Sequence, residues 1–171
     1  MAITKIGFLG HFYQPPTQPW EIILQIYREC YKKVFDSASR LDGFAFSMDL
    51  AKSLGERMPP ECIAAMSELF KKRRLELVNT SAYHYLLPLV PTAVAERQLE
   101  LNRDFYRSTF GPVTHPEGFF PPELATFHWL WNTVSDQRYD WCVADDELFN
   151  YTRPQFPEHE KVPQNWIPEI D

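Results

Sequence analysis

The sequence is poor in the features that mark disulfide scaffolds, membrane proteins and nucleic-acid binders. It has only 3 cysteines in 171 residues, and Cys30, Cys62 and Cys142 are too far apart for a metal or disulfide motif. The 17 Lys and Arg are outnumbered by 23 Asp and Glu, and a net charge of −6 argues against a nucleic-acid binder. No apolar run approaches the ~18 residues of a membrane span, and the first residues lack a signal-peptide hydrophobic segment. We therefore predict a cytoplasmic protein with neither a membrane nor a nucleic-acid partner.

Proline and aromatic residues are abundant. The chain has 15 prolines, and its aromatic residues are 5 Trp, 8 Tyr and 13 Phe. The prolines stand mainly at the ends of apolar runs, and 44% of all residues are hydrophobic, so we expect a packed core rather than disorder. Aromatic rings suit both a core and stacking against sugar rings, and composition alone does not separate the two.

Short apolar runs alternate with amphipathic segments along the chain. Strands are predicted at Ile3–Leu9, Gly43–Met48, Leu75–Val78, Gly118–Phe120 and Trp141–Ala144. Helical faces are predicted from Trp20 to Phe35, after Pro59-Pro60, from Thr92 to Gly111, and through Leu124, Phe127, Trp131 and Val134. This alternation predicts an α/β fold of parallel strands joined by helical crossovers, either a doubly wound sheet or a barrel.

Polar residues follow each predicted strand. In chain order these are His11, Asp49, Asn79, Glu123 and the pair Asp145-Asp146. Because parallel α/β folds carry their active sites at the carboxyl ends of the strands, we expect these residues to share one rim.

Two of the expected loops and one pair of carboxylates each have a functional and an ordinary interpretation. Residues His11–Pro16 either offer groups that bind sugar hydroxyls or form a proline turn. Residues Ser81–Pro91 either form a wall of the substrate site or are a packed loop. Glu123 and Asp145 follow apolar and proline residues, which desolvates them in part. Two such carboxylates are what glycoside hydrolysis needs, although Glu123 also suits a first helical turn and Asp145 a turn that ends a strand.

Four motifs together resemble a known family. They are His11-Phe-Tyr-Gln-Pro-Pro, Leu75-Glu-Leu-Val, Tyr83-His84 with Leu87-Pro-Leu, and Gly118-Phe-Phe-Pro-Pro-Glu123. Their order resembles that of glycoside hydrolase family 57, which contains α-amylases, 4-α-glucanotransferases and branching enzymes. The chain differs from the family's usual pattern at Tyr13, where a second histidine is common, and at Asn79, where glycine is common.

The resemblance implies a (β/α)7 barrel, here truncated after about five strands, and a retaining mechanism with no cofactor or metal. It assigns Glu123 as nucleophile and Asp145 as acid/base, with Asp146 as the rival. It also assigns His11, Gln14 and His84 to substrate binding, and we add Tyr83, Trp20 and Asp146 as further candidates. The expected substrate is an α-glucan or oligosaccharide.

The resemblance also bears on domain organisation. Residues 1–150 are expected to be the N-terminal portion of the catalytic barrel, and residues 151–171 a proline-rich extension. The open barrel edge would pair with a second copy or with a complementing chain, and the isolated chain would be inactive or nearly so.

Two alternatives remain at this point. One is a metal-dependent hydrolase like the polysaccharide deacetylases, although no two of the five histidines are close in sequence. The other is a non-catalytic carbohydrate-binding fragment.

Overall fold

The computed structural model describes residues 8–41, 45–111 and 115–145. Within these ranges, strands and helices alternate, and every paired strand is parallel to its neighbour. The strands are β1 (Leu9–Phe12), β2 (Phe46–Leu50), β3 (Leu75–Val78), β4 (Gly118–Phe119) and β5 (Trp141–Cys142). The predicted parallel α/β fold is therefore confirmed for the described part of the chain.

The five strands form two hydrogen-bonded groups joined at a single residue. The first has the order β1-β2-β3, and the second pairs β4 with β5. Asn79, which directly follows β3, donates its N–H to Gly118 O at 2.8 Å and accepts from Phe120 N at 2.8 Å. This bridge continues the strand order from β3 to β4, as parallel strands of one barrel wall require.

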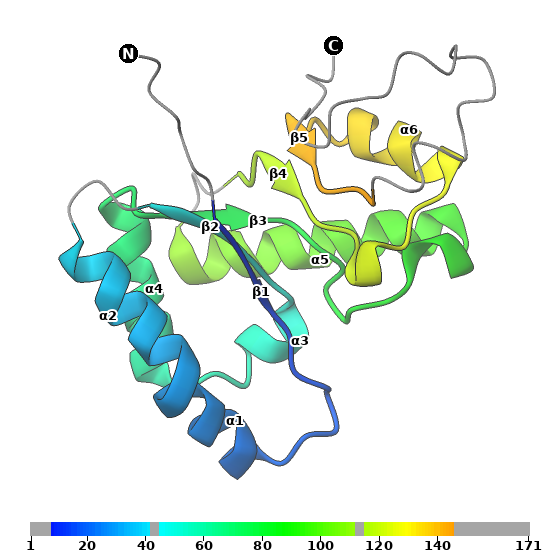
Figure 1. Cartoon of the computed structure of the whole chain (residues 1–171). Helices are drawn as coiled ribbons and strands as arrows, with labels where there is room; N and C mark the ends of the chain where they lie inside the picture. The colour runs from blue at the N-terminus through cyan, green and yellow to red at the C-terminus, as the bar shows by residue number, and fades with distance from the viewer. Residues whose placement is uncertain (1–7, 42–44, 112–114, 146–171) are drawn as a thin grey trace, which may run out of the picture.

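Helices cover one face of the strands (Figure 1). They are α1 (Trp20–Ile26), α2 (Lys32–Arg40), α3 (Lys52–Gly55), α4 (Pro60–Lys71), α5 (Thr92–Phe110) and α6 (His128–Asp136), with short 3-10 turns η2 (Leu87–Leu89) and η3 (Pro122–Leu124). Figure 1 shows α2 and α4 side by side against β1-β2-β3, and α6 close to β4 and β5. No helix within the described ranges is both long and apolar enough to cross a bilayer.

The first helical segment contains a π-helical turn, η1 (Tyr27–Tyr31), between α1 and α2. The large buried residues of this segment are Ile23, Tyr27, Tyr31 and Phe35, each four positions after the last. Four residues of an α-helix turn about 40° past one full turn, so this spacing would wind around a regular helix. The wider π turn keeps the four side chains on the sheet side of the helix.

Two cores stabilise the fold. The larger lies between β1-β2-β3 and the helices α1, α2 and α4, and the smaller joins α5, β4 and α6 around Phe119 and Leu130. In β2 the alternate residues Phe46, Met48 and Leu50 enter the larger core, whereas Ser47 and Asp49 face the other side of the strand. The face of β2 turned away from the larger core is therefore polar.

Several predicted boundaries are corrected by the structure. The first strand is Leu9–Phe12 rather than Ile3–Leu9, whose first residues lie outside the described ranges, so His11 lies within the strand. Likewise β2 runs to Leu50 rather than ending at Met48, so Asp49 is a strand residue. His11 of β1 and Asp49 of β2 lie opposite each other in the register, and their side chains are hydrogen-bonded within the sheet.

Helix α6, which was predicted to pass through Leu124 and Phe127, also begins later than predicted. Residues Glu123 and Leu124 have positive φ values of 56° and 53°, and Phe127 is extended with φ −153°. The helix therefore starts at His128, and Glu123 belongs to the 3-10 turn η3 instead of a first α-helical turn.

Candidate active site

The carboxyl ends of the strands gather a compact set of side chains. We call it the strand-end cluster, and its members are His11, Tyr13, Asp49, His84, Phe120 and Glu123. They come from β1, the residue after it, β2, the loop after β3, and the loop and 3-10 turn after β4.

Two histidine–carboxylate pairs form the polar part of the cluster. Asp49 places its two oxygens 2.9 and 3.1 Å from Nδ1 of His11. His84 Nε2 lies 3.1 Å from Oε1 of Glu123. The Asp49 side chain is only 2% exposed and the His84 side chain 6%, whereas the Glu123 side chain is 63% exposed. Glu123 is thus the solvent-facing carboxylate, fixed by a buried imidazole.

Stacked rings hold the two pairs together. His11 stacks on Phe120 with ring centroids 4.7 Å apart and on His84 at 5.6 Å. Tyr13 stacks on His84 at 3.8 Å. The rings restrict both imidazoles, so their nitrogen atoms have defined directions.

The backbone is strained at both members of the His84–Glu123 pair. His84 and Glu123 each have φ 56°, a left-handed conformation that non-glycine residues seldom adopt. Such conformations cluster at functional sites, where surrounding contacts enforce them. Here a turn from His84 N to Ser81 O at 3.1 Å and another from Leu124 N to Pro121 O at 3.0 Å supply part of that constraint.

Helix α5 anchors the strand ends through three buried polar residues, each four positions apart. Gln98 Oε1 accepts from Tyr83 N at 3.0 Å, Asn102 Oδ1 accepts from Lys52 N at 2.7 Å, and Tyr106 donates to Val78 O at 2.8 Å. The loop that carries His84 is therefore tied to the longest helix in the described part of the chain.

Electrostatics distinguish His11 within the cluster. The hydrogen bond that His11 donates to Asp49 raises the pKa of His11 above 6.5, against partial desolvation that lowers it, and the charges of Asp49 and Glu123 raise it further. His11 therefore retains its positive charge at a pH where an ordinary histidine has begun to lose it.

The structure brings together some of the predicted site residues and separates others. His11, His84 and Glu123 lie in one cluster. Gln14 is close in sequence, but its Nε2 donates to the Tyr31 hydroxyl at 2.9 Å. Asp145 is half-buried three residues after β5.

Two of the three further candidates, Tyr83 and Trp20, lie apart from these. Tyr83 is 41% exposed, and its ring is tilted at 46° to that of Tyr85 and lies under the Lys52 ammonium at 5.6 Å. Trp20 is 49% exposed at the start of α1, and no described contact joins it to the cluster. Asp146 lies outside the described residues, as does the predicted extension 151–171.

Sequence reasoning missed three members of the cluster as site residues. Asp49 was expected only as a polar residue after a strand, and Tyr13 and Phe120 were not assigned to the site. The sequence feature that could have identified Asp49 as a site residue was a carboxylate between Met48 and Leu50 in an apolar run. Nothing in the sequence indicated its partner 38 positions earlier.

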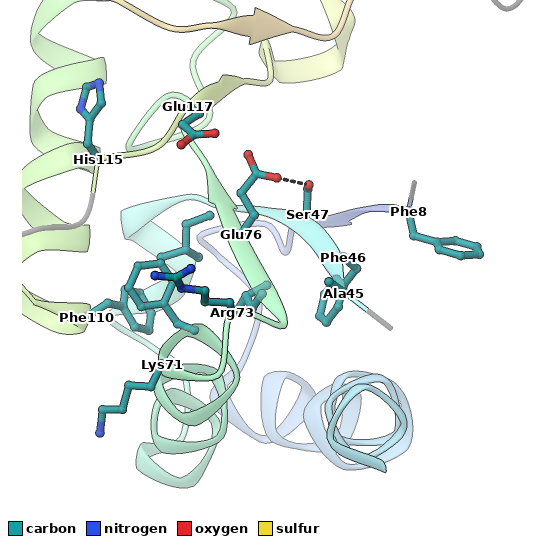
Figure 2. Close-up of a pocket in the computed structure, with 13 residues that line it drawn as sticks. Phe8, Ala45, Phe46, Ser47, Lys71, Arg73, Glu76, Phe110, His115 and Glu117 are labelled. Atoms are coloured by element: carbon teal, nitrogen blue, oxygen red, sulfur yellow. Dashed lines mark hydrogen bonds between the residues drawn. The ribbon is translucent and has the colours of Figure 1, made fainter. Parts of the chain in front are cut away.

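A cavity of about 840 Å³ opens at the other end of the strands. Figure 2 shows Glu76 and Glu117 at this cavity, with the Ser47 hydroxyl donating to Glu76. Parallel α/β folds keep their chemistry at the carboxyl ends, so we take the strand-end cluster, and not this cavity, as the candidate active site.

Comparisons with known proteins bear on the family and the fold of the chain. The sequence profile of glycosyl hydrolase family 57 matches residues 12–164. No curated protein sequence matches. The fold is similar to a 4-α-glucanotransferase from Thermococcus litoralis, with TM-score 0.76 and 18% identity over 91% of this chain and 25% of that one.

Two further solved structures share the fold. The α-amylase AmyC from Thermotoga maritima gives TM-score 0.71 and 14% identity over 86% of this chain and 40% of that one. A CE4 family pseudoenzyme from Bacillus anthracis gives 0.52 and 12% over 86% of this chain and 46% of that one. The chain thus spans less than half the length of each of these proteins.

Proposed function

Because the chain belongs to glycosyl hydrolase family 57, we propose that it carries the nucleophile and the acid/base of a retaining site that acts on α-glucans, by hydrolysis or by transfer. The observation that carries the proposal is the His84–Glu123 pair, an exposed carboxylate held by a buried imidazole in a strained turn at the strand ends.

Glu123 is proposed as the nucleophile. The hydrogen bond from His84 engages Oε1, so Oε2 is available to attack the anomeric carbon of a bound sugar. Attack forms a glycosyl–Glu123 ester as the bond to the leaving oxygen breaks. Water or a sugar hydroxyl then attacks the same carbon and releases the Glu123 carboxylate, and the identity of this acceptor separates hydrolysis from transfer.

Asp145 is proposed as the acid/base, protonating the leaving oxygen in the first step and deprotonating the acceptor in the second. The position of Asp145 supports this role, because Asp145 follows β5 and Glu123 follows β4, the parallel neighbour of β5. A retaining pair requires carboxyl groups roughly 5–5.5 Å apart. Asp146 is the rival, because adjacent residues of an extended chain point to opposite faces.

The remaining candidates are proposed to bind the glycan. His11 and His84 present ring nitrogens in the cluster, and Gln14 follows β1 two residues on, with its amide nitrogen on the Tyr31 hydroxyl. Tyr83 and Trp20 offer exposed rings for stacking on sugars farther from the point of cleavage.

Covalent labelling tests the nucleophile directly. In a form of the protein that carries the complete barrel, an activated fluorinated α-glucosyl donor should label the protein once, and peptide mass spectrometry should place the label on Glu123. In that form Glu123→Gln should abolish labelling and lower turnover of a maltooligosaccharide by about 10⁴-fold or more, because covalent catalysis is lost.

Glu117→Gln is the matched control, since it makes the same change on an exposed glutamate just before β4. It should label and turn over as the wild type does. Labelling of a different carboxylate, or unimpaired turnover by Glu123→Gln, would refute the assignment.

The state of the isolated chain is part of the same proposal. Among the described strands, β1 and β5 each have a neighbour on one side only, and unpaired edges favour association. We expect the 171-residue chain to self-associate, or to bind glycan weakly without turning it over. A monomer with robust turnover in size-exclusion chromatography and a maltooligosaccharide assay would contradict this.

A metal-dependent deacetylase is the second candidate, favoured by the fold likeness to a peptidoglycan deacetylase from Bacillus subtilis, with TM-score 0.51. Within the described residues, no three His, Cys, Asp or Glu side chains are grouped as a metal site requires. Release of acetate from an acetylated glycan, abolished by a chelator, would support the deacetylase. Glycan cleavage that survives the chelator would support the glycoside hydrolase.

A further inference from the structure

Asp49 is a buried carboxylate at the base of the strand-end cluster, and no role in sugar chemistry has yet been assigned to it. The residue is 1% exposed, between Met48 and Leu50 of β2, which are fully buried. An ionised carboxylate in such a position needs a hydrogen-bonding partner. The parallel register sets Asp49 opposite His11, and both of its oxygens reach the same ring nitrogen, Nδ1.

The surroundings of His11 restrict what else its ring can do. One nitrogen is engaged by Asp49, and the rings of Phe120, His84 and Tyr13 stack around it. The polar atom that remains for a ligand is Nε2. An ionised carboxylate only accepts, so Nδ1 carries its hydrogen toward Asp49.

We propose that Asp49 is a positioning residue that fixes the orientation of His11 and keeps it doubly protonated, so that Nε2–H is a charged donor to a sugar hydroxyl. This inference rests on the proposed function, since it names the group that delivers the charge to the glycan. Asp49 itself does not touch the sugar and acts only through His11.

Four ionisable groups lie around His11, and the two carboxylates among them favour the charged form of its ring. They are Asp49 from β2, Glu123 from η3, His84 from the loop after β3, and Tyr13 after β1. The two carboxylates both raise the pKa of His11, with the Asp49 hydrogen bond as the largest cause. Glycan affinity that depends on this charge should be complete below pH 6.5 and decline as the pH rises through the raised pKa.

The test compares Asp49→Asn with a control, Asp36→Asn. Asparagine keeps an acceptor for Nδ1–H but lacks the negative charge, so it separates charge from orientation. Asp36 lies on α2, paired with Lys32 on the outer surface, and its variant makes the same change away from the site. Histidine NMR titration and maltooligosaccharide affinity are measured for both variants and for the wild type across the pH range.

In Asp49→Asn, we expect the pKa of His11 to fall and the affinity near pH 7 to weaken by roughly tenfold, the size of one lost charged hydrogen bond. The affinities of variant and wild type should converge at high pH. Asp36→Asn should match the wild type throughout. In the double variant His11→Gln/Asp49→Asn, the second change should weaken binding no further than His11→Gln alone.

The outcomes separate this inference from the proposed function. A His11 titration unchanged by Asp49→Asn, or affinity lost equally at every pH, would overturn the positioning role. If Asp49→Asn does not fold, His11→Gln decides, because a pH dependence that persists without His11 overturns the role as well. A folded wild type that binds no maltooligosaccharide refutes the proposed substrate class, while the histidine titration still reports whether Asp49 sets the charge.

Discussion

Asn79 is the residue whose replacement should most clearly damage the fold beneath the site. It is fully buried directly after β3. Its side-chain amide donates to Leu99 O at 3.2 Å and to the Tyr139 hydroxyl, and its carbonyl accepts from Asn102 at 3.0 Å. Asn79→Ala keeps the backbone bridge to β4 but removes these three bonds.

The magnitude follows from those three bonds. Each buried hydrogen bond contributes about 0.5–1.5 kcal/mol net, and Asn102 keeps a second acceptor, Leu50 O, at 3.2 Å. With a small cavity added, we expect a loss of about 3 kcal/mol in the free energy of unfolding. At about 2–4 °C per kcal/mol for a chain of this size, the melting temperature should fall by about 6–12 °C.

Urea unfolding followed by circular dichroism measures this loss. Asn132→Ala, at an exposed position of α6, is the matched control and should change stability by less than about 0.5 kcal/mol. If Asn79→Ala were as mild as Asn132→Ala, the buried amide network would contribute nothing net, and the reasoning would be wrong.

Two further predictions concern packing and thiol chemistry. A Cβ at Gly118 would collide with the Trp141 ring, so Gly118→Ala should destabilise the chain by about 1–3 kcal/mol in urea unfolding, and a smaller residue at position 141 should recover part of that loss. Burial raises the pKa of Cys62 to about 12 and that of Cys142 to about 11, whereas Cys30 is exposed. Iodoacetamide near pH 8 should therefore modify Cys30 first in the native chain, as mass spectrometry would show, and equal modification of all three would contradict the burial.

Regular elements with strong local patterns were predictable from the sequence. Strand β3 has the predicted bounds, Leu75–Val78, and α5 begins at Thr92 and ends before Gly111, whose φ of 121° suits glycine. In these segments the spacing of the apolar residues indicates the type of element, and the residue that follows indicates where it ends. The family resemblance added the barrel and the order of the motifs, which periodicity alone left open.

The geometry of the site depended on information that no local pattern carries. His11 and Asp49 were both taken to follow strands because polar residues commonly do, yet they pair inside the sheet. The buried side of helix α5 holds not only apolar Leu99 and Phe105 but also Gln98, Asn102 and Tyr106. Buried polar residues of this kind are explained only by partners distant in sequence.

The π-helical turn at Tyr27–Tyr31 has a consequence for evolutionary comparison. Such a turn accommodates one more residue than a regular helix of the same span. A relative with an uninterrupted helix would have one residue fewer here, and a correct alignment would need a single-residue gap within a helix. If the turn instead became regular α-helix with no residue removed, α2 would rotate by about 100° relative to α1. Tyr31, whose hydroxyl accepts from Gln14, would then turn away from the sheet. Loss of the π turn without the matching deletion would thus reach the His11–Pro16 loop without altering any residue in it.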